Sequence, residues 1–124
     1  MFGRNWRVIM PFSEEPGEIR VSVSTLVEMA ARSAFLVEGV MGDFNHLLRN
    51  TKVVVQGETL SPNDRVSTKE KGVFINISLK VDSRKNWEEI AQEVQKRVAN
   101  MIREWGFPLE GVNVEVSEVE WFLE

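Results

Sequence analysis

Residues 73–82 read VFINISLKVD, the most regular alternation of apolar and other side chains in the chain. Every second position is β-branched or leucine: Val73, Ile75, Ile77, Leu79 and Val81. Because successive side chains of a strand point to opposite faces, these residues would share one face. We therefore expect a strand here, at the centre of the sheet.

A long amphipathic helix is predicted directly after this strand. Asn86 and Glu89 form a capping pair at its start, and Gly106 with Pro108 ends the pattern. Apolar side chains recur at helical spacing between these signals: Trp87, Ile90, Ala91, Val94, Val98, Met101, Ile102 and Trp105. The helix should run from Trp87 to Trp105, with both tryptophans in its buried stripe.

The region before the central strand begins with a short alternating segment at residues 18–22, where Ile19 and Val21 would share one face of a first core strand. Ser22 can cap a helix over residues 23–36. Gly39 suits the left-handed position after that helix. A strand–helix unit is therefore expected at this end of the domain.

Shorter elements are expected between these two units and after the long helix. Asp43 would cap a second helix that ends at Arg49, and residues 53–55 form a short strand. The polar residues 56–72 form a long exposed connection, in which residues 65–67 would extend the hairpin. After the long helix a final strand is expected at Val112, Val114 and Val116, with a bulge or a departure from the sheet beyond Ser117.

Taken together, these elements predict an α+β fold with two layers: a mixed sheet with helices packed on one face. The approximate order is β-α-(short α)-β-β-α-β. Residues 1–17 would be an amino-terminal extension or extra strand, residues 18–118 the domain, and residues 119–124 a carboxy-terminal tail.

Composition restricts the function classes. The 124 residues carry a formal net charge of −4, which disfavours broad attraction to nucleic acid or anionic lipid. The chain has no cysteine, and its apolar runs fall well short of the roughly 18 residues of a membrane span. We therefore expect no direct membrane insertion and no cysteine-based chemistry.

Motifs for catalysis and cofactor binding are missing as well. His46 is the only histidine, so the common zinc and histidine–nucleophile arrangements cannot be assembled from this chain. No phosphate-binding glycine motif occurs, and Ser22 fits a helix cap better than a nucleophile. We therefore expect no enzyme activity and name no catalytic, cofactor-binding or metal-binding residue.

Two stretches resemble the alkaline-shock-protein family, a bacterial envelope-stress family. Residues 17–42, GEIRVSVSTLVEMAARSAFLVEGVMG, are similar to its first signature, and residues 90–116, IAQEVQKRVANMIREWGFPLEGVNVEV, to its second. The resemblance implies a cytoplasmic protein of envelope stress or envelope maintenance. It also implies membrane-anchored relatives, self-associating members and no known catalytic residue.

From this resemblance we expect a non-enzymatic scaffold or assembly protein that acts through protein–protein contacts. It would form a homo-oligomer. It would be cytoplasmic and peripheral at the inner face of the cell membrane, held there by a membrane-anchored protein of the same family.

Apolar residues outside the expected domain are the candidate interface. They are Trp6, Val8, Ile9, Phe12, Trp121, Phe122 and Leu123. Aromatic side chains often supply the buried anchors of interfaces. The alternative is that these amino-terminal and carboxy-terminal residues fold over the edge of their own sheet.

A second function is suggested by the GxxG sequence at Gly39, Val40, Met41 and Gly42. It lies between two expected helices, as in KH nucleic-acid-binding domains, where such a loop clamps the nucleotide backbone. Its apolar middle positions and the acidic chain disfavour this use. The structural interpretation, with both glycines as turn residues, is therefore preferred.

Overall fold

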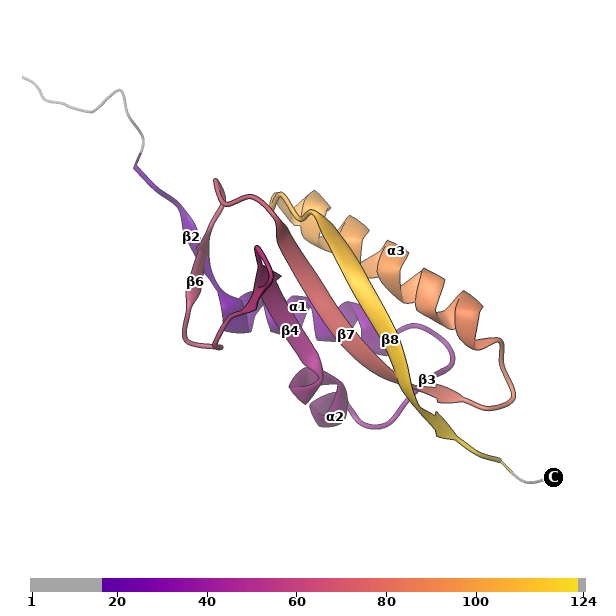
Figure 1. The fold of residues 1–124 in the computed structure, drawn as a ribbon. Helices are drawn as coiled ribbons and strands as arrows, with labels where there is room; N and C mark the ends of the chain where they lie inside the picture. The colour runs from indigo at the N-terminus through magenta and orange to yellow at the C-terminus, as the bar shows by residue number, and fades with distance from the viewer. Residues whose placement is uncertain (1–16, 123–124) are drawn as a thin grey trace, which may run out of the picture.

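The fold is built around β7 (Val73–Asp82), the long strand at the centre of the sheet in Figure 1. A computed structural model describes residues 17–122. The other elements are β2 (Arg20–Ser22), α1 (Val23–Phe35), β3 (Val40–Met41), α2 (Phe44–Arg49), β4 (Thr51–Val55), β5 (Glu58–Thr59), β6 (Arg65–Ser67), α3 (Trp87–Trp105) and β8 (Gly111–Glu120).

Strands lie on both sides of β7, which confirms its predicted central position. β8 runs parallel to it, with Ile77 opposite Val114. On the other side, β4 and β3 pair with it antiparallel, one after the other along its length. A parallel pair needs a crossover connection, and α3 supplies it between β7 and β8.

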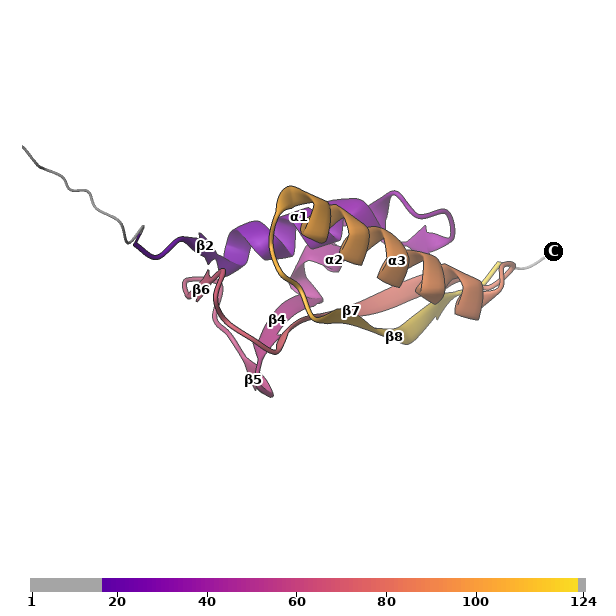
Figure 2. The same cartoon turned by 90° about the horizontal axis from the view of Figure 1, so that it is seen from above.

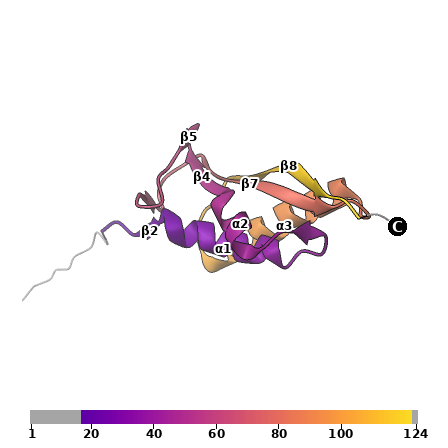
Figure 3. The same ribbon diagram turned by 90° about the horizontal axis from the view of Figure 1, so that it is seen from below.

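The helices cover one face of this sheet (Figures 2 and 3). The alternating residues of β7 that face them are buried, and so are Ile90, Val94, Val98 and Ile102 of α3. Burial of one strand face against a helical stripe makes a single core between the two layers. The predicted α+β class and two-layer arrangement are confirmed.

Three side-chain caps set the helix starts as predicted. Ser22, Asp43 and Asn86 each accept a hydrogen bond from a backbone amide in the first turn of α1, α2 and α3. The long helix ends at Trp105, where Gly106 takes the left-handed conformation with φ 111°. Helix boundaries were therefore readable from local signals.

Gly39 allows α3 to lie close to the turn that follows α1. Its φ is 101°, and a Cβ at this position would lie 2.5 Å from Ile90 Cδ1. Its carbonyl oxygen accepts a hydrogen bond of 3.0 Å from the Asp82 amide. A residue without a side chain is therefore required where these elements meet.

The first strand was predicted correctly for Val21, which packs against the core, and wrongly for Ile19. β2 pairs with β6 in a separate two-stranded sheet, so residues 65–67 do not extend the hairpin of β4. Ile19 is 68% exposed. Ile19 precedes β2, which begins at Arg20, so the predicted alternation extended one residue beyond the strand.

The two tryptophans of α3 were also predicted wrongly as core residues. Trp87 is 59% exposed and Trp105 is 53% exposed. Both follow the phase of the buried stripe, but each lies in a terminal turn of the helix. The apolar stripe of α3 therefore extends at both ends beyond the elements that bury the middle of the helix.

The phase change after Ser117 is a bulge in the β7–β8 ladder, one of the two explanations predicted. Leu79 lies opposite Val116, whereas Lys80 lies opposite Glu118. Ser117 is the extra residue, and its hydroxyl donates to the Leu79 carbonyl at 3.3 Å. The strand continues to Glu120, past residue 118.

Candidate functional site

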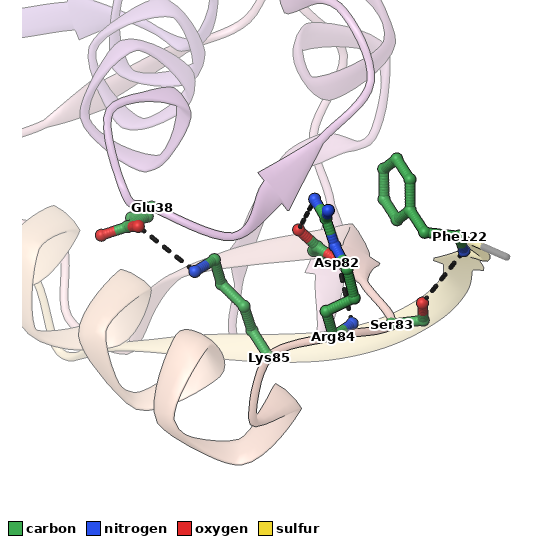
Figure 4. Close-up of polar contacts among 6 residues, drawn as sticks. All are labelled: Glu38, Asp82, Ser83, Arg84, Lys85 and Phe122. Atoms are coloured by element: carbon green, nitrogen blue, oxygen red, sulfur yellow. Dashed lines mark hydrogen bonds and ion pairs between the residues drawn. The ribbon is translucent and has the colours of Figure 1, made fainter. Parts of the chain in front are cut away.

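The end of β8 is fastened to the connection between β7 and α3 (Figure 4). The Ser83 amide donates to the Glu120 carbonyl at 3.0 Å. The Phe122 amide in turn donates to Ser83 Oγ at 3.2 Å. Ser83 therefore fixes the backbone on both sides of Trp121.

A carboxylate–guanidinium pair stabilises this connection. Asp82 is buried, and its Oδ1 accepts hydrogen bonds from the Arg84 amide at 2.9 Å and from Arg84 Nε at 3.0 Å. Arg84 Nη2 donates to Oδ2 at 2.9 Å. The side-chain bond from Arg84, and then the backbone bond, lower the pKa of Asp82 below its ordinary value. The carboxylate raises the pKa of Arg84 in return.

The same guanidinium group contacts Phe122. The Arg84 guanidinium carbon lies 3.9 Å from the centre of the Phe122 ring, within the range of a cation–π interaction. Figure 4 shows the ring beside the Asp82–Arg84 pair. One arginine therefore joins the end of β7 to the segment that follows β8.

Two further ion pairs surround this connection. Lys80 Nζ lies 2.8 Å from Glu120, and this hydrogen bond raises the pKa of Lys80. Lys85 Nζ lies 3.2 Å from Glu38, on the turn between α1 and β3. Because both pairs are partly exposed, each contributes little to stability alone. The first pair joins β7 to β8, and the second joins the connection to the turn after α1.

These contacts leave the side chain of Trp121 exposed. Trp121 is 75% exposed, although its neighbours Glu120 and Phe122 are both held by Ser83. Val119 is 36% exposed nearby in sequence. The arrangement presents an indole ring on an ordered backbone, which suits binding to another protein.

Of the other candidate interface residues, only Phe122 lies within the described residues. Phe122 is half-buried against Arg84, so it holds the segment and Trp121 is the exposed member. Leu123 and the amino-terminal residues Trp6, Val8, Ile9 and Phe12 lie outside the described residues.

The GxxG sequence adopts a strand conformation at its centre. Val40 and Met41 form β3 and pair with Val81 and Lys80 of β7. Gly39 and Gly42 flank this strand with φ values of 101° and 88°. The segment therefore differs from the free loop that nucleic-acid clamping requires, and the two glycines act as turn residues.

Within residues 17–122, no three His, Asp or Glu side chains lie close enough together to hold a metal ion. His46 lies half-buried in α2. No helix of this region combines the length and apolar character needed to cross a membrane.

An apolar groove lies beside the start of α1. It has a volume of about 620 Å³ and is lined by Val23, Ser24, Val27, Glu28, Leu48, Arg49, Thr51, Lys52, Val53, Thr59, Leu60 and Pro62. The sequence analysis missed this groove, because its walls come from α1, α2, β4 and the β5–β6 connection. Only their packing brings these residues together.

The chain matches a known protein family. The family model of the alkaline shock protein 23 family, described as having a cell envelope-related function, matches residues 12–121. No curated protein and no solved structure matches the chain. The matched region includes both stretches that resemble the family and ends at Trp121.

Proposed function

The chain belongs to the alkaline shock protein 23 family, whose function is cell envelope-related, and from this premise we propose that it is a non-catalytic assembly protein of the envelope. It acts through protein–protein contacts. Its own copies are one partner, and a membrane-anchored protein of the same family is the other.

The exposed Trp121 is the observation that carries this proposal. Tryptophan is enriched among the residues that dominate interface energies, and such anchors bury their rings in a partner. Trp121 is 75% exposed on a backbone that Ser83 holds on both sides. An ordered anchor loses less conformational entropy on binding than a mobile one.

The charged groups near Trp121 support a structural role for this region. The carboxylate oxygens of Asp82 are both bonded to Arg84, and Lys80 is paired with Glu120. Shifted pKa values can mark catalytic groups, but ion pairs that stabilise a fold shift them too. Here the pKa shifts of Asp82 and Arg84 come from their mutual pairing, and the shift of Lys80 comes from Glu120, so these groups organise the surface that presents Trp121.

The proposed location is the cytoplasm, at the inner face of the cell membrane. A chain with net charge −4 gains no general attraction to anionic lipid, so a protein partner would hold it at the membrane. The anchored relative supplies the membrane segment. This chain supplies the contact surface.

Affinity capture from solubilised envelopes tests the proposal, with tagged wild-type chain, Trp121→Ala and Trp105→Ala compared at equal amounts. Trp105 is the matched control, because it is also an exposed tryptophan but lies at the end of α3. Wild type and Trp105→Ala should retain a membrane-anchored family protein, and Trp121→Ala should lose it. Recovery of that protein with all three chains would contradict the role of Trp121.

A vesicle assay separates protein-mediated from lipid-mediated association. Purified wild-type chain is mixed with protein-free vesicles that contain anionic lipid, at physiological salt, and the vesicles are sedimented. The chain should remain in the supernatant. Tight binding to the vesicles would contradict an envelope location that depends on a protein partner.

A further inference from the structure

We propose that the open edge of β8 binds an extended segment of another protein that is rich in lysine and arginine, and that this segment adds a strand to the sheet. This inference rests on the proposed function, because the membrane-anchored partner would supply the segment from the cytoplasmic flank of its membrane span. Such flanks carry an excess of lysine and arginine. The inference adds the mode of contact and the part of the partner that makes it.

β8 is a long strand with one unpaired side. It covers ten residues, Gly111–Glu120, and is the outermost strand beside β7 in Figure 1. Within residues 17–122, no strand other than β7 pairs with it. Successive residues of a strand direct their backbone groups to opposite sides, so about half of the β8 amides and carbonyls point away from β7. An added strand bonds to groups of this kind.

The register identifies which residues of β8 have outward backbone groups. The Ser78 amide donates to the Asn50 carbonyl, just before β4, so Ser78 faces away from β8 and its neighbour Ile77 faces β8. Val114 lies opposite Ile77. In a parallel pair, a residue bonds to the two residues that flank its opposite partner, so Val114 itself points outward. Val116, two residues further on, shares this direction.

α3 flanks the outer side of β8. Gln95 Nε2 donates to the Val112 carbonyl at 3.1 Å, so this face of the helix lies beside the strand. Trp87 lies two helical turns before Gln95 on nearly the same face, and it is 59% exposed. Val114 and Val116 pack against the core but are only partly buried. An added strand would therefore cover apolar surface as well as backbone groups.

The side chains of β8 are acidic. The strand carries Glu115, Glu118 and Glu120, and it has no lysine or arginine. Lys80 pairs with Glu120, and the pKa of Lys80 is raised mainly by this hydrogen bond and further by Glu118. Glu115 and Glu118 are exposed and form no ion pair within residues 17–122. Three carboxylates against one ammonium group leave this edge negative, which favours a basic segment.

The same charges disfavour a second copy of the chain as the added strand. Pairing of β8 with β8 of another copy would place Glu115 and Glu118 against glutamates, and like charges on neighbouring strands are destabilising. A segment with lysine at alternate positions would instead place ammonium groups beside these carboxylates. Its end would reach Trp121, whose exposed ring can receive a lysine or arginine in a cation–π contact.

Three synthetic peptides of the length of β8 test the edge on the full chain. The first alternates lysine and valine, and the second alternates glutamate and valine. The third is the lysine peptide with a methyl group on every backbone nitrogen, which keeps the charge but removes the donors of a ladder. Isothermal titration calorimetry measures each dissociation constant. The lysine peptide should bind wild type about tenfold or more tightly than either of the other two.

A charge reversal on the strand provides the matched protein variants. Glu115→Lys/Glu118→Lys changes the β8 edge, and Glu18→Lys/Glu58→Lys makes the same change at exposed glutamates outside β8. Circular dichroism verifies that both variants are folded. The first variant should bind the lysine peptide about tenfold or more weakly and should prefer the glutamate peptide. The second should bind the lysine peptide as wild type does.

Hydrogen exchange on wild type locates the added strand without any substitution. The lysine peptide should slow exchange of the Val114 and Val116 amides, because both point outward and would gain bonding partners. The methylated peptide should leave their exchange unchanged. Equal binding by the methylated peptide, absence of protection at these two amides, or no binding of the lysine peptide would each overturn the inference.

Affinity capture separates failure of this inference from failure of the proposed function. If Glu115→Lys/Glu118→Lys retains the membrane-anchored protein and Trp121→Ala loses it, the strand-addition inference is wrong and the proposed function stands. If the lysine peptide protects β8 and the charge reversal loses the anchored protein while Trp121→Ala retains it, the β8 edge is supported and the role of Trp121 is wrong.

Discussion

Arg84 binds two partners at once: its guanidinium group forms hydrogen bonds of 3.0 and 2.9 Å with Asp82, and its central carbon lies 3.9 Å from the Phe122 ring. Asp82 ends β7, and Phe122 follows β8. This arginine therefore connects the core strand to the segment that presents Trp121. Substitutions in this connection should therefore weaken assembly more than they lower the stability of the fold.

Replacement of Phe122 by leucine should weaken self-association while the fold is kept. Leucine retains apolar bulk but removes the ring that Arg84 contacts, so the Trp121 segment loses part of its order. The loss corresponds to about a two- to fivefold weaker assembly. Light scattering measures assembly, and thermal unfolding provides the control. A fall in melting temperature as large as that of a core variant would show that Phe122 supports the whole domain instead.

The acid sensitivity of the fold should depend on Asp82. The hydrogen bonds from Arg84 lower the pKa of Asp82 in the folded state below its ordinary value. The ionised group therefore stabilises the fold above its unfolded pKa, and this contribution disappears as the pH falls through the folded pKa. Urea unfolding from about pH 5 to about pH 2 should show a shallower acid decline for Asp82→Asn than for wild type. Glu104→Gln, which removes an exposed carboxylate of α3, is the control and should retain the wild-type slope. Equal slopes for all three chains would rule out this role of Asp82.

Gly39→Ala should destabilise the fold through both backbone strain and contact with Ile90. The positive φ alone costs about 1–3 kcal/mol, and the added Cβ would meet Ile90 Cδ1 at 2.5 Å. Gly57→Ala is the matched control, because Gly57 has a φ of +86° and no heavy atom within 4 Å of an added Cβ. Gly39→Ala should therefore cost more free energy of unfolding than Gly57→Ala.

A double-mutant cycle with Ile90→Ala tests the cause of this difference. Shortening Ile90 should recover part of the loss in Gly39→Ala and none of the loss in Gly57→Ala, with a coupling of about 0.5–3 kcal/mol for the contacting pair. Chemical denaturation supplies the free energies. Additive effects at Gly39 and Ile90 would mean that the contact is not the source of strain.

The tryptophans of α3 should matter little for stability. Trp87→Ala and Trp105→Ala should each change the free energy of unfolding by about 1 kcal/mol or less, because both side chains are more than half exposed. Ile102→Ala, in the buried stripe of the same helix, should cost about 2–5 kcal/mol. Equal losses for Trp105→Ala and Ile102→Ala would contradict the observed burial.

The long elements were predictable because their signals are local. Alternation identified β7, and the Asn86 cap with Gly106 gave both ends of α3. The pairing of β2 with β6 was missed, because each has three residues and their partnership depends on distant packing. Periodicity also placed Trp105 on the correct stripe without indicating that the neighbours of α3 do not cover its last turn.

The candidate site was predicted only in part. The sequence singled out Trp121 and Phe122 because they are large apolar residues outside the expected domain. It gave no sign that Ser83 and Phe122, 39 residues apart, are joined by a hydrogen bond. That contact requires the parallel pairing of β7 with β8, and the groove likewise requires four elements to pack together. Such non-local geometry has no local sequence signal.

Multi-angle light scattering over a concentration series measures whether Trp121 mediates assembly. Wild type and Trp105→Ala should show the same rise in molar mass with concentration, and Trp121→Ala should need about a fivefold or higher concentration for an equal rise. A molar mass that stays at the monomer value for wild type, or an identical rise for all three chains, would contradict the account.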